Sequence, residues 1–533
     1  MREKSLSGRR YLAVRAAFQV VDRRGHLSDG GAQSSRPRHP PCSARQRSLK
    51  EVSGAMIEHL PSRNLRVAVV GGGFSGAVFA VQLARKATVG VAIDIIEPRT
   101  LLGAGVAYST TDPSHRINVP ATKMSVFRDA PAHFAEWLQK DAELASDPAA
   151  SWPTGQAYPR RVVFGRYVAS LVESARRMRP DVTIHHVRET VGGIERRDGG
   201  YAVQLVAGGT CFADVVVLAA SHPPASVPRM ISAALGNDPA VIRDQWADGW
   251  TGISHDSNVL IVGTALSMAD AVASLDHSGH TGLITAFSRR GLLSRGHADP
   301  LMPSFEHFAR VAAPDTARGL SGEVRAALGA AQSVGLPWQA VFDDVRAHAP
   351  RLWSALSLAE RRRFLRHLRV WWDVHRYRLA PQVEAVIRRK RKDGSLEVLG
   401  ASLTGVRRGE DRIEVTLRPR SAPRSTEIHR AVDVIVIATG PAHAAAIEQN
   451  PALAALARQG LIRADPTDLG LDVDGRSRAL GLDGLPNPTL LVVGPLARAR
   501  LGELMGLPQV SEHAEEVAAQ VADWLEKAPE RSG

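Results

Sequence analysis

The sequence LRVAVVGGGFSGA, residues 65–77, determines the fold that is predicted for the rest of the chain. Its first six residues are mainly apolar and rich in valine, the pattern of a strand buried on both faces of a parallel sheet. Gly71, Gly73 and Gly76 have the spacing G-x-G-x-x-G, and residues 78–86 continue as an apolar helix. The first glycine permits a tight turn, the second lets the backbone approach a pyrophosphate, and the third lets the helix pack on the strand. The stretch therefore predicts the first half of a dinucleotide-binding unit.

A second strand and an acidic residue complete this unit. Residues 91–96 are mainly apolar, and Glu97 follows them, 26 residues after Gly71. A carboxylate at this place accepts hydrogen bonds from the hydroxyls of an adenosine ribose, which favours FAD or NAD. The helix N-terminus also offers free N–H groups to the phosphates. We therefore predict cofactor contacts at Gly71, Gly73, Phe74, Ser75, Gly76 and Glu97. The alternative is a structural glycine turn that binds nothing.

A unit of the same length recurs later in the chain. Residues 258–262 predict a strand, a helix follows through Leu275, and residues 282–287 predict the next strand. Arg289 stands 26 residues after Gly263, so a base replaces the acid of the first unit. Guanidinium groups suit a ribose 2′-phosphate, which favours NADP and, as the reductant, NADPH over NADH. The predicted contacts are Gly263, Ala265, Ser267, Ser288, Arg289 and Arg290.

Two residues of the second unit depart from the glycine pattern. Ala265 replaces the glycine that lets backbone reach a pyrophosphate, and Met268 replaces the third small residue. These departures leave a fold that binds no nucleotide as the alternative. Ser267 and Asp270 lie at the expected helix N-terminus, where phosphate contact and capping are the predicted roles.

The two units are arranged one inside the other. Each is followed by a stretch in which apolar and polar residues alternate as in a strand. A strongly apolar strand then follows, at residues 214–219 after the first unit and at residues 433–437 after the second. We therefore predict an α/β fold of two nested Rossmann-like dinucleotide-binding domains with a helical insertion between Pro300 and Pro381. The predicted parts are a basic leader at 1–64, the first part of an FAD-binding domain at 65–225, an NADP-binding domain with the helical insert at 226–395, and a strand-rich return with the second part of the FAD-binding domain at 396–533.

The net charge of +13 is concentrated near the N-terminus. Residues 1–55 hold 12 Lys and Arg against four acids, which leaves +5 for the other 478 residues. For this leader we favour an over-extended start, with translation beginning at Met56, over a transit peptide or a basic arm for nucleic acid. The remaining surplus is modest and suits dinucleotide phosphates, which argues against a nucleic-acid partner.

Cysteine spacing and hydropathy exclude several classes of protein. Cys42 and Cys211 are 169 residues apart, which excludes a disulfide scaffold and the paired cysteines of a disulfide reductase. No Cys or His spacing of a metal site is seen, so no metal is expected. Residues 67–84 carry no charge, but their glycines fit a strand–turn–helix better than a membrane span. With no secretory signal recognised, we expect a cytoplasmic protein without a membrane partner.

Together these stretches resemble the two-dinucleotide-binding-domain flavoproteins, specifically the bacterial FAD/NAD(P)-binding family that includes flavin-dependent urate hydroxylases. The resemblance covers roughly residues 65–520 and rests on residues 71–77, 103–108, 115–121, 263–270, 288–291, 372–378, 438–441 and 493–495. It implies that Gly105, Tyr108, His115, Asn118 and Val119 lie along the flavin, and that Gly494 and Pro495 bring a helix N-terminus toward the far end of FAD. It also places Thr439 and Gly440 among the cofactor contacts.

The resemblance and the paired nucleotide units favour an FAD-dependent, NADPH-using monooxygenase. In such an enzyme NADPH reduces FAD, O₂ adds to form a flavin C4a-peroxide, and the protein positions a small polar or anionic substrate. This chemistry needs no catalytic triad, and the catalytic residues are not identified from the sequence. The alternatives are an NADPH-dependent flavin reductase or dehydrogenase without oxygen insertion, and a non-catalytic flavin-binding or nucleic-acid-associated protein.

One segment rich in arginine and aromatic residues supplies the catalytic candidates. Residues 361–378 place apolar side chains at roughly helical spacing with bases opposite. We predict an anion-binding wall for an NADPH phosphate or an acidic substrate, with His375, Arg376 and Arg378 as its candidates. A packed helix with a solvated basic face is the alternative. The run at 388–392 is predicted to be an exposed turn.

Overall fold

A computed structural model describes residues 65–220, 222–246, 250, 252–423 and 425–528. The basic leader, including Met56 and Cys42, lies outside the described residues, and so does Ser221. The described residues belong to one structural unit.

The first sheet confirms the strand–turn–helix–strand unit predicted at residues 65–97. β1 (Leu65–Val70), α2 (Phe74–Lys86) and β2 (Val91–Ile96) follow in order, and β1 pairs with β2 in parallel. The six strands have the order β15-β16-β7-β1-β2-β3, in which only β15 and β16 are antiparallel neighbours. The other strands are β3 (Val182–Val187), β7 (Val215–Leu218), β15 (Arg478–Leu480) and β16 (Pro486–Val492).

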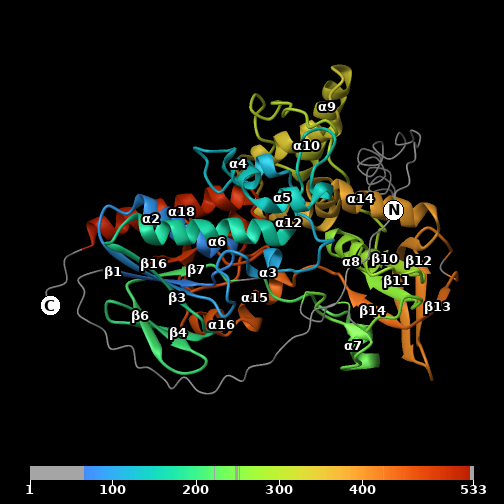
Figure 1. Ribbon diagram of the computed structural model, residues 1–533, viewed down its shortest axis with the longest axis horizontal. Helices are drawn as coiled ribbons and strands as arrows, with labels where there is room; N and C mark the ends of the chain where they lie inside the picture. The colour runs from blue at the N-terminus through green and yellow to red at the C-terminus, as the bar shows by residue number, and fades with distance from the viewer. Residues whose placement is uncertain (1–64, 221, 247–249, 251, 424, 529–533) are drawn as a thin grey trace, which may run out of the picture. The chain divides into compact units, whose positions relative to one another are not determined.

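The alternation of side chains along β1 explains why this sheet is covered on both faces. Val67 and Val69 pack into the core formed with α2, α6 (Arg161–Met178) and α18 (Gln509–Lys527). Ala68 and Val70 point to the opposite face. There they meet a three-stranded antiparallel sheet and α16, which lie on the other side of the first sheet in Figure 1. These covering elements are β4 (Val191–Arg197), β5 (Gly200–Leu205), β6 (Thr210–Ala213) and α16 (Pro451–Arg458).

The second sheet contains the second predicted unit. β9 (Val259–Val262), α8 (Leu266–His277) and β10 (Ile284–Ser288) repeat the order of the first unit, with β9 and β10 parallel. The sheet order is β13-β12-β11-β10-β9-β14-β8. The remaining strands are β8 (Val241–Ile242), β11 (Leu396–Arg408), β12 (Ile413–Pro419), β13 (Ile428–Val432) and β14 (Val434–Ile437). The predicted α/β fold of two nested nucleotide-binding domains is confirmed.

A helical insertion separates β10 from β11, as predicted. It contains α9 (Ala317–Ser333), α10 (Trp338–Ala347), α11 (Ala349–Ala355), α12 (Leu358–His367), α13 (Arg369–Arg376) and α14 (Pro381–Lys392). The stripe predicted at 361–378 is divided between α12 and α13, which meet at Leu368. The other short helices are α3 (Gly105–Tyr108), α4 (His133–Lys140), α5 (Ala142–Ser146), α7 (Arg229–Leu235), α15 (Ala446–Gln449) and α17 (Arg498–Leu501).

Two local predictions were wrong. The predicted domain boundary at 395/396 falls within the second sheet. β11, which begins at Leu396, pairs with β10 in parallel and with β12 in antiparallel. Strands of the second sheet continue to Ile437, and β15 is the first later strand of the first sheet. The basic run at 388–392 is the last turn of α14 rather than an exposed turn. Lys390 is 3% exposed, and its buried ammonium group donates to the carbonyl of His280 at 3.0 Å.

The glycine turns of the two units have matching backbone contacts. Gly71 has a φ of +102° and donates to Ile96, while Gly263 has a φ of +128° and donates to Phe287. A Cβ on Gly71 would lie 2.5 Å from the carbonyl oxygen of Ala219, and one on Gly263 would lie 2.1 Å from that of Ala438. Each glycine is therefore required both by its φ and by the close approach of the neighbouring parallel strand.

Two crossover segments connect the sheets and lie against each other. Ala225 bridges to Pro441, and the Thr439 hydroxyl donates to the carbonyl of Ser226 at 3.1 Å. Beside them the rings of His222 and His443 meet edge to face with centroids 5.0 Å apart. Burial lowers the pKa of His222 to about 4 and that of His443 to about 3, and the nearby Arg498 adds to both shifts. Both imidazoles are therefore neutral in the fold at neutral pH.

The turn geometry predicts unequal costs for two glycine substitutions. Gly263→Ala places a methyl group against the Ala438 carbonyl, so we expect a loss of about 3 kcal/mol or more in the free energy of unfolding. Gly440→Ala is the control, because Gly440 has a φ of +78° but no heavy atom lies within 4 Å of the place that its Cβ would take. Its strain alone costs about 1–2 kcal/mol. Urea unfolding followed by tryptophan fluorescence measures both, and equal losses would contradict the steric account.

The histidine pair predicts a loss of stability in mild acid. The unfolded chain binds a proton near the ordinary histidine pKa of 6.5, whereas folded His443 does so only near 3. The free energy of unfolding therefore falls as pH drops from 6.5 toward 4, by up to about 1.4 kcal/mol per pH unit for each such histidine. His443→Phe should reduce this slope, and His429→Phe, at an exposed site on β13, should leave it unchanged. Urea titrations at several pH values measure this dependence. If the free energy of unfolding changes with pH equally in wild type and His443→Phe, the assignment is refuted.

Candidate cofactor and substrate site

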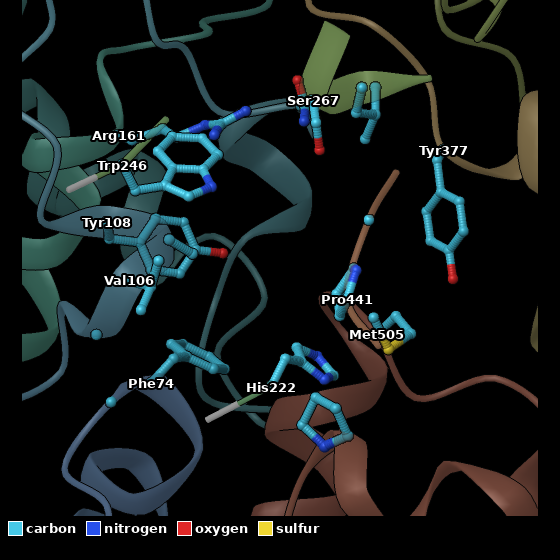
Figure 2. A pocket seen from close by; sticks show the side chains of 18 of the residues that line it. Phe74, Val106, Tyr108, Arg161, His222, Trp246, Ser267, Tyr377, Pro441 and Met505 are labelled. Carbon is cyan, nitrogen blue, oxygen red and sulfur yellow. The ribbon is translucent and has the colours of Figure 1, made fainter. Parts of the chain in front are cut away.

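A cavity of about 700 Å³ lies at the carboxyl ends of strands from both sheets. Gly71 and Ala219 reach it after β1 and β7, and Leu266 and Ala438 reach it after β9 and β14. Ligands of open α/β sheets bind at this edge. Figure 2 shows side chains from both domains and from the helical insertion around the same space.

Most residues predicted for the first nucleotide site line this cavity, whereas most of those predicted for the second do not. The predicted residues in the lining are Gly71, Gly73, Phe74, Ser75, Glu97, Gly105, Tyr108, Asn118, Val119, Ser267, Gly440, Pro495, Arg376 and Arg378. The predicted residues absent from the lining are Gly76, His115, Gly263, Ala265, Ser288, Arg289, Arg290, Thr439, Gly494 and His375.

The first glycine turn leaves space for a ligand next to its backbone. The nearest heavy atom to a Cβ on Gly73 would be the Cα of Gly105 at 3.4 Å, so Gly73 has no steric need to be glycine within the protein itself. Gly76 differs, because a Cβ there would lie 2.0 Å from the carbonyl oxygen of Gly71. The first glycine and the third thus serve the fold, while Gly73 faces the cavity.

Glu97 is held in place at the end of β2. Its carboxylate accepts from the backbone N–H of Gly72 at 3.0 Å and from the N–H and guanidinium of Arg99 at 3.1 and 3.0 Å. Glu97 is 4% exposed yet lines the cavity. A carboxylate oxygen accepts more than one hydrogen bond, so this group retains capacity for ribose hydroxyls. The turn, the free space at Gly73 and the fixed acid fit the adenosine diphosphate half of FAD.

The second turn keeps its backbone shape without its second glycine. Ala265 precedes α8 with φ −97° and ψ −154°, close to the φ −67° and ψ −166° of Gly73 before α2. Both conformations are open to an alanine side chain. Met268, in place of the third glycine, is 1% exposed and packs in the core. The two departures are therefore compatible with the same fold.

The bases predicted to bind a 2′-phosphate follow β10 outside the cavity lining. Arg289 is exposed, and the guanidinium of Arg290 lies 6.0 Å from the ring of Trp371. Ser288 fixes the loop before them, because its hydroxyl bonds Thr264 at 2.8 Å and accepts from Gly291 at 3.0 Å. This loop is thereby attached to the second glycine turn.

His115, predicted along the flavin, is a buried link between the domains. Its Nδ1 lies 2.8 Å from the Thr110 hydroxyl, and its Nε2 lies 2.9 Å from the hydroxyl of Ser274 on α8. Ser274 also donates to Asp112 at 2.6 Å. Burial lowers the pKa of His115, which favours the neutral ring.

Asp270 has a different role from the predicted capping. Both of its oxygens accept from Arg161 of α6 at 2.9 Å, and α8 has no side-chain capping hydrogen bond. The Arg161 guanidinium also lies 5.4 Å from the ring of Trp246. Figure 2 shows Arg161 and Trp246 next to each other, with Tyr108 nearby. This ion pair joins the two domains beside the cavity, and its partner is 109 residues away in sequence.

Of the three catalytic candidates, one is buried in the core and two reach the cavity. His375 is 1% exposed, stacks on Phe342 with centroids 4.7 Å apart, and bonds the Trp371 carbonyl through Nδ1. It is a core residue, which agrees with the packed-helix alternative for this position. Arg376 and Arg378 reach the cavity, where Arg376 pairs with Glu503 at 2.6 Å and Arg378 pairs with Asp343 at 2.8 Å.

Several lining residues were not identified from the sequence. They are Arg161, Trp246, His222, Lys123, Asp343, Arg346 and Met505. Each is supplied by a segment outside the glycine turns, so a local motif gives no signal for it. Gly494, not in the lining, has a φ of +79° and donates to the buried ring of His513 at 3.1 Å, which holds the turn that brings Pro495 to the cavity.

The described residues lack two other kinds of feature. Within this part of the chain, no group of three or more His, Cys, Asp or Glu residues is placed to hold a metal ion. Of the helices described, none combines the length and the apolar character needed to cross a membrane.

Comparisons with known proteins agree with this arrangement. A family model described as FAD-NAD(P)-binding matches residues 68–223. Ornithine hydroxylase from Pseudomonas aeruginosa is 16% identical with a TM-score of 0.58, and the ornithine N-hydroxylase of Kutzneria sp. 744, in a complex with reduced FAD, NADP⁺ and L-ornithine, is 16% identical with a TM-score of 0.57. L-lysine 6-monooxygenase from Pseudomonas syringae is 17% identical with a TM-score of 0.54.

Each of these three similarities covers 87% of this chain and 99% of the other. No curated protein matches the sequence. The structural similarity confirms the fold, and the family model confirms the resemblance to FAD/NAD(P)-binding flavoproteins. The match to the FAD-NAD(P)-binding model is confined to residues 68–223, and the chain shares its two-domain Rossmann-type fold with these solved structures.

Proposed function

We propose that the protein is an FAD-dependent monooxygenase that uses NADPH and O₂ to hydroxylate a small polar molecule. The observation that carries the proposal is that residues of both nucleotide units line one cavity at the carboxyl edge of both sheets. Its fold is shared with N-hydroxylases of small amino acids, one of them in a complex with FAD and NADP⁺. The proposal includes a cytoplasmic location, where NADPH is available, and excludes nucleic acid, membrane and metal as partners.

The first domain supplies the proposed FAD site. The Gly71–Gly73 turn and the N-terminus of α2 would bind the pyrophosphate, and Glu97 would accept from the ribose. Val106 and Tyr108 lie together on one side of the cavity, near Phe74, as Figure 2 shows. When bound, FAD would take a hydride from NADPH and react with O₂. The apolar and aromatic side chains around it would exclude water from that reaction.

The second domain supplies the proposed NADPH site. Leu266 and Ser267, after the second glycine turn, face the same cavity as the proposed flavin contacts. Arg289 and Arg290 would bind the 2′-phosphate from the loop after β10, next to that turn. The nicotinamide would then reach the space shared by both domains, which is where a hydride transfer requires it.

The cofactor assignment predicts a yellow protein that loses its colour with NADPH. Purified wild type should retain FAD, and anaerobic addition of NADPH should bleach its absorption near 450 nm, a wavelength set by the flavin itself. Gly73→Val should fold, because the position has no close neighbour, but should lose FAD since the side chain takes cavity space. Gly329→Val, at an open position on α9, is the matched control. FAD-loaded wild type that does not bleach would exclude an NADPH-dependent enzyme.

Oxygen consumption separates the monooxygenase from the flavin reductase. A monooxygenase releases hydrogen peroxide when its substrate is absent, and the fraction of O₂ that appears as peroxide falls when a substrate is hydroxylated. A panel of small amino acids, amines and organic acids tests for this fall. A reductase passes electrons to another acceptor, so its peroxide yield stays constant across the panel.

The bases after β10 predict which nicotinamide cofactor is used. Arg289→Ala with Arg290→Ala should raise the KM for NADPH by about tenfold or more and change that for NADH little, because one lost guanidinium–phosphate contact is worth about 1.5–3 kcal/mol. Steady-state NAD(P)H oxidation measures both constants. Equal effects on NADPH and NADH would show that these arginines do not bind the 2′-phosphate.

A further inference from the structure

One side of the cavity is formed by arginines of the helical insertion. We define the arginine wall as Arg346 from α10 together with Arg376, Tyr377 and Arg378 from the end of α13. Arg376 and Arg378 are 8% and 7% exposed, so their charges lie in a largely dry environment. Charges in such a place require compensation by opposite charges or by a ligand.

The protein compensates this charge only in part. Arg376 pairs with Glu503, which is 2% exposed, and Arg378 pairs with Asp343. Lys123 also lines the cavity and lies 3.7 Å from Asp343, so that this carboxylate is shared between two cations. Three arginines and one lysine therefore face two carboxylates. Burial and the neighbouring arginines lower the pKa of Arg346 to about 9, which still leaves it charged at neutral pH.

The wall also holds buried hydrogen-bond donors that have no acceptor. Among the described residues, Nε of Arg346, Nε of Arg376 and the hydroxyl of Tyr377 have no hydrogen-bond partner. Burial raises the pKa of Tyr377, so its hydroxyl keeps its proton and can donate. Glu503 retains one unpartnered oxygen, but it lies behind Arg376 and is not part of the lining. What the wall offers to the cavity is a surplus of positive charge.

We propose that the arginine wall binds a carboxylate of the substrate, so that the molecule hydroxylated is a small organic anion. A carboxylate supplies the negative charge that Glu503 and Asp343 leave uncompensated, and guanidinium groups bind carboxylates with favourable geometry. This inference rests on the proposed monooxygenase function and names the substrate class of the same site.

The position of the wall distinguishes it from the sites proposed for cofactor phosphates. Tyr377 and Met505 lie across the cavity from Phe74, Val106 and Tyr108 in Figure 2. The wall comes from α10 and α13, whereas the two phosphate-binding turns precede α2 and α8. The first glycine turn and the wall therefore occupy different parts of the same lining.

Matched probes test the charge preference directly. Succinate and succinamide have nearly the same shape, but only succinate carries carboxylates, so isothermal titration of the FAD-loaded protein should show succinate binding at least tenfold more tightly. Arg346→Gln should weaken succinate binding by about tenfold, because it removes one charge of the wall. Arg363→Gln, on α12 and outside the lining, removes an exposed charge and should keep the wild-type affinity. Thermal unfolding of each variant without ligand checks that it is folded.

Three results would overturn the inference. Equal affinity for succinate and succinamide, or unchanged succinate affinity in folded Arg346→Gln, would show that the wall does not select a carboxylate. Displacement of succinate by NADPH, with inorganic phosphate bound as tightly, would assign the wall to a cofactor phosphate. Bleaching of wild type by NADPH is measured separately. If NADPH bleaches the wild type but succinate binds no more tightly than succinamide, the proposed function stands and this inference is refuted. If succinate is preferred but NADPH does not bleach the protein, the proposed function is refuted.

Discussion

The close approach of a glycine turn to the end of a neighbouring strand fixes both halves of this molecule. Gly71 meets the carbonyl of Ala219 and Gly263 meets that of Ala438, each within a distance that no side chain allows. Since these strands are parallel, the contacts align their carboxyl ends and determine where each crossover segment leaves its sheet. Those segments then line the cavity, so the shape of the site follows from two backbone contacts.

Buried polar contacts tie the two domains together around that cavity. The Arg161 and Asp270 pair and the Thr110–His115–Ser274 hydrogen bonds each join a side chain of the first domain to one of α8. Removing one member would leave a buried charge or donor without its partner, at a cost of several kcal/mol for the ion pair. These groups therefore favour one arrangement of the domains, and that arrangement places Ser267 and Tyr108 on the same cavity.

Features set by local spacing were predictable from the sequence, and features set by distant partners were not. The strands at 65–70 and 91–96 have the predicted bounds, because burial on both faces leaves a mainly apolar run. Asp270 was assigned to capping from its place after a glycine turn, but its partner is on α6. Lys390 belongs to a run of five bases, and a charge pattern does not reveal that one of them is buried against a distant carbonyl. The boundary at 395/396 failed because β11 serves as a parallel strand and then as an antiparallel one.

The same distinction separates the nucleotide turns from the helical insertion. The nucleotide turns are constrained by φ, by close backbone contacts and by the strand edges, so their side chains have little freedom to vary. The helical insertion contributes Asp343, Arg346, Arg376 and Arg378 to the lining. Burying these cations costs free energy that Glu503 and Asp343 offset only in part. The cavity brings these arginines to the same lining as Phe74 and Tyr108, so the proposed anionic ligand, bound there, would offset the remaining charge.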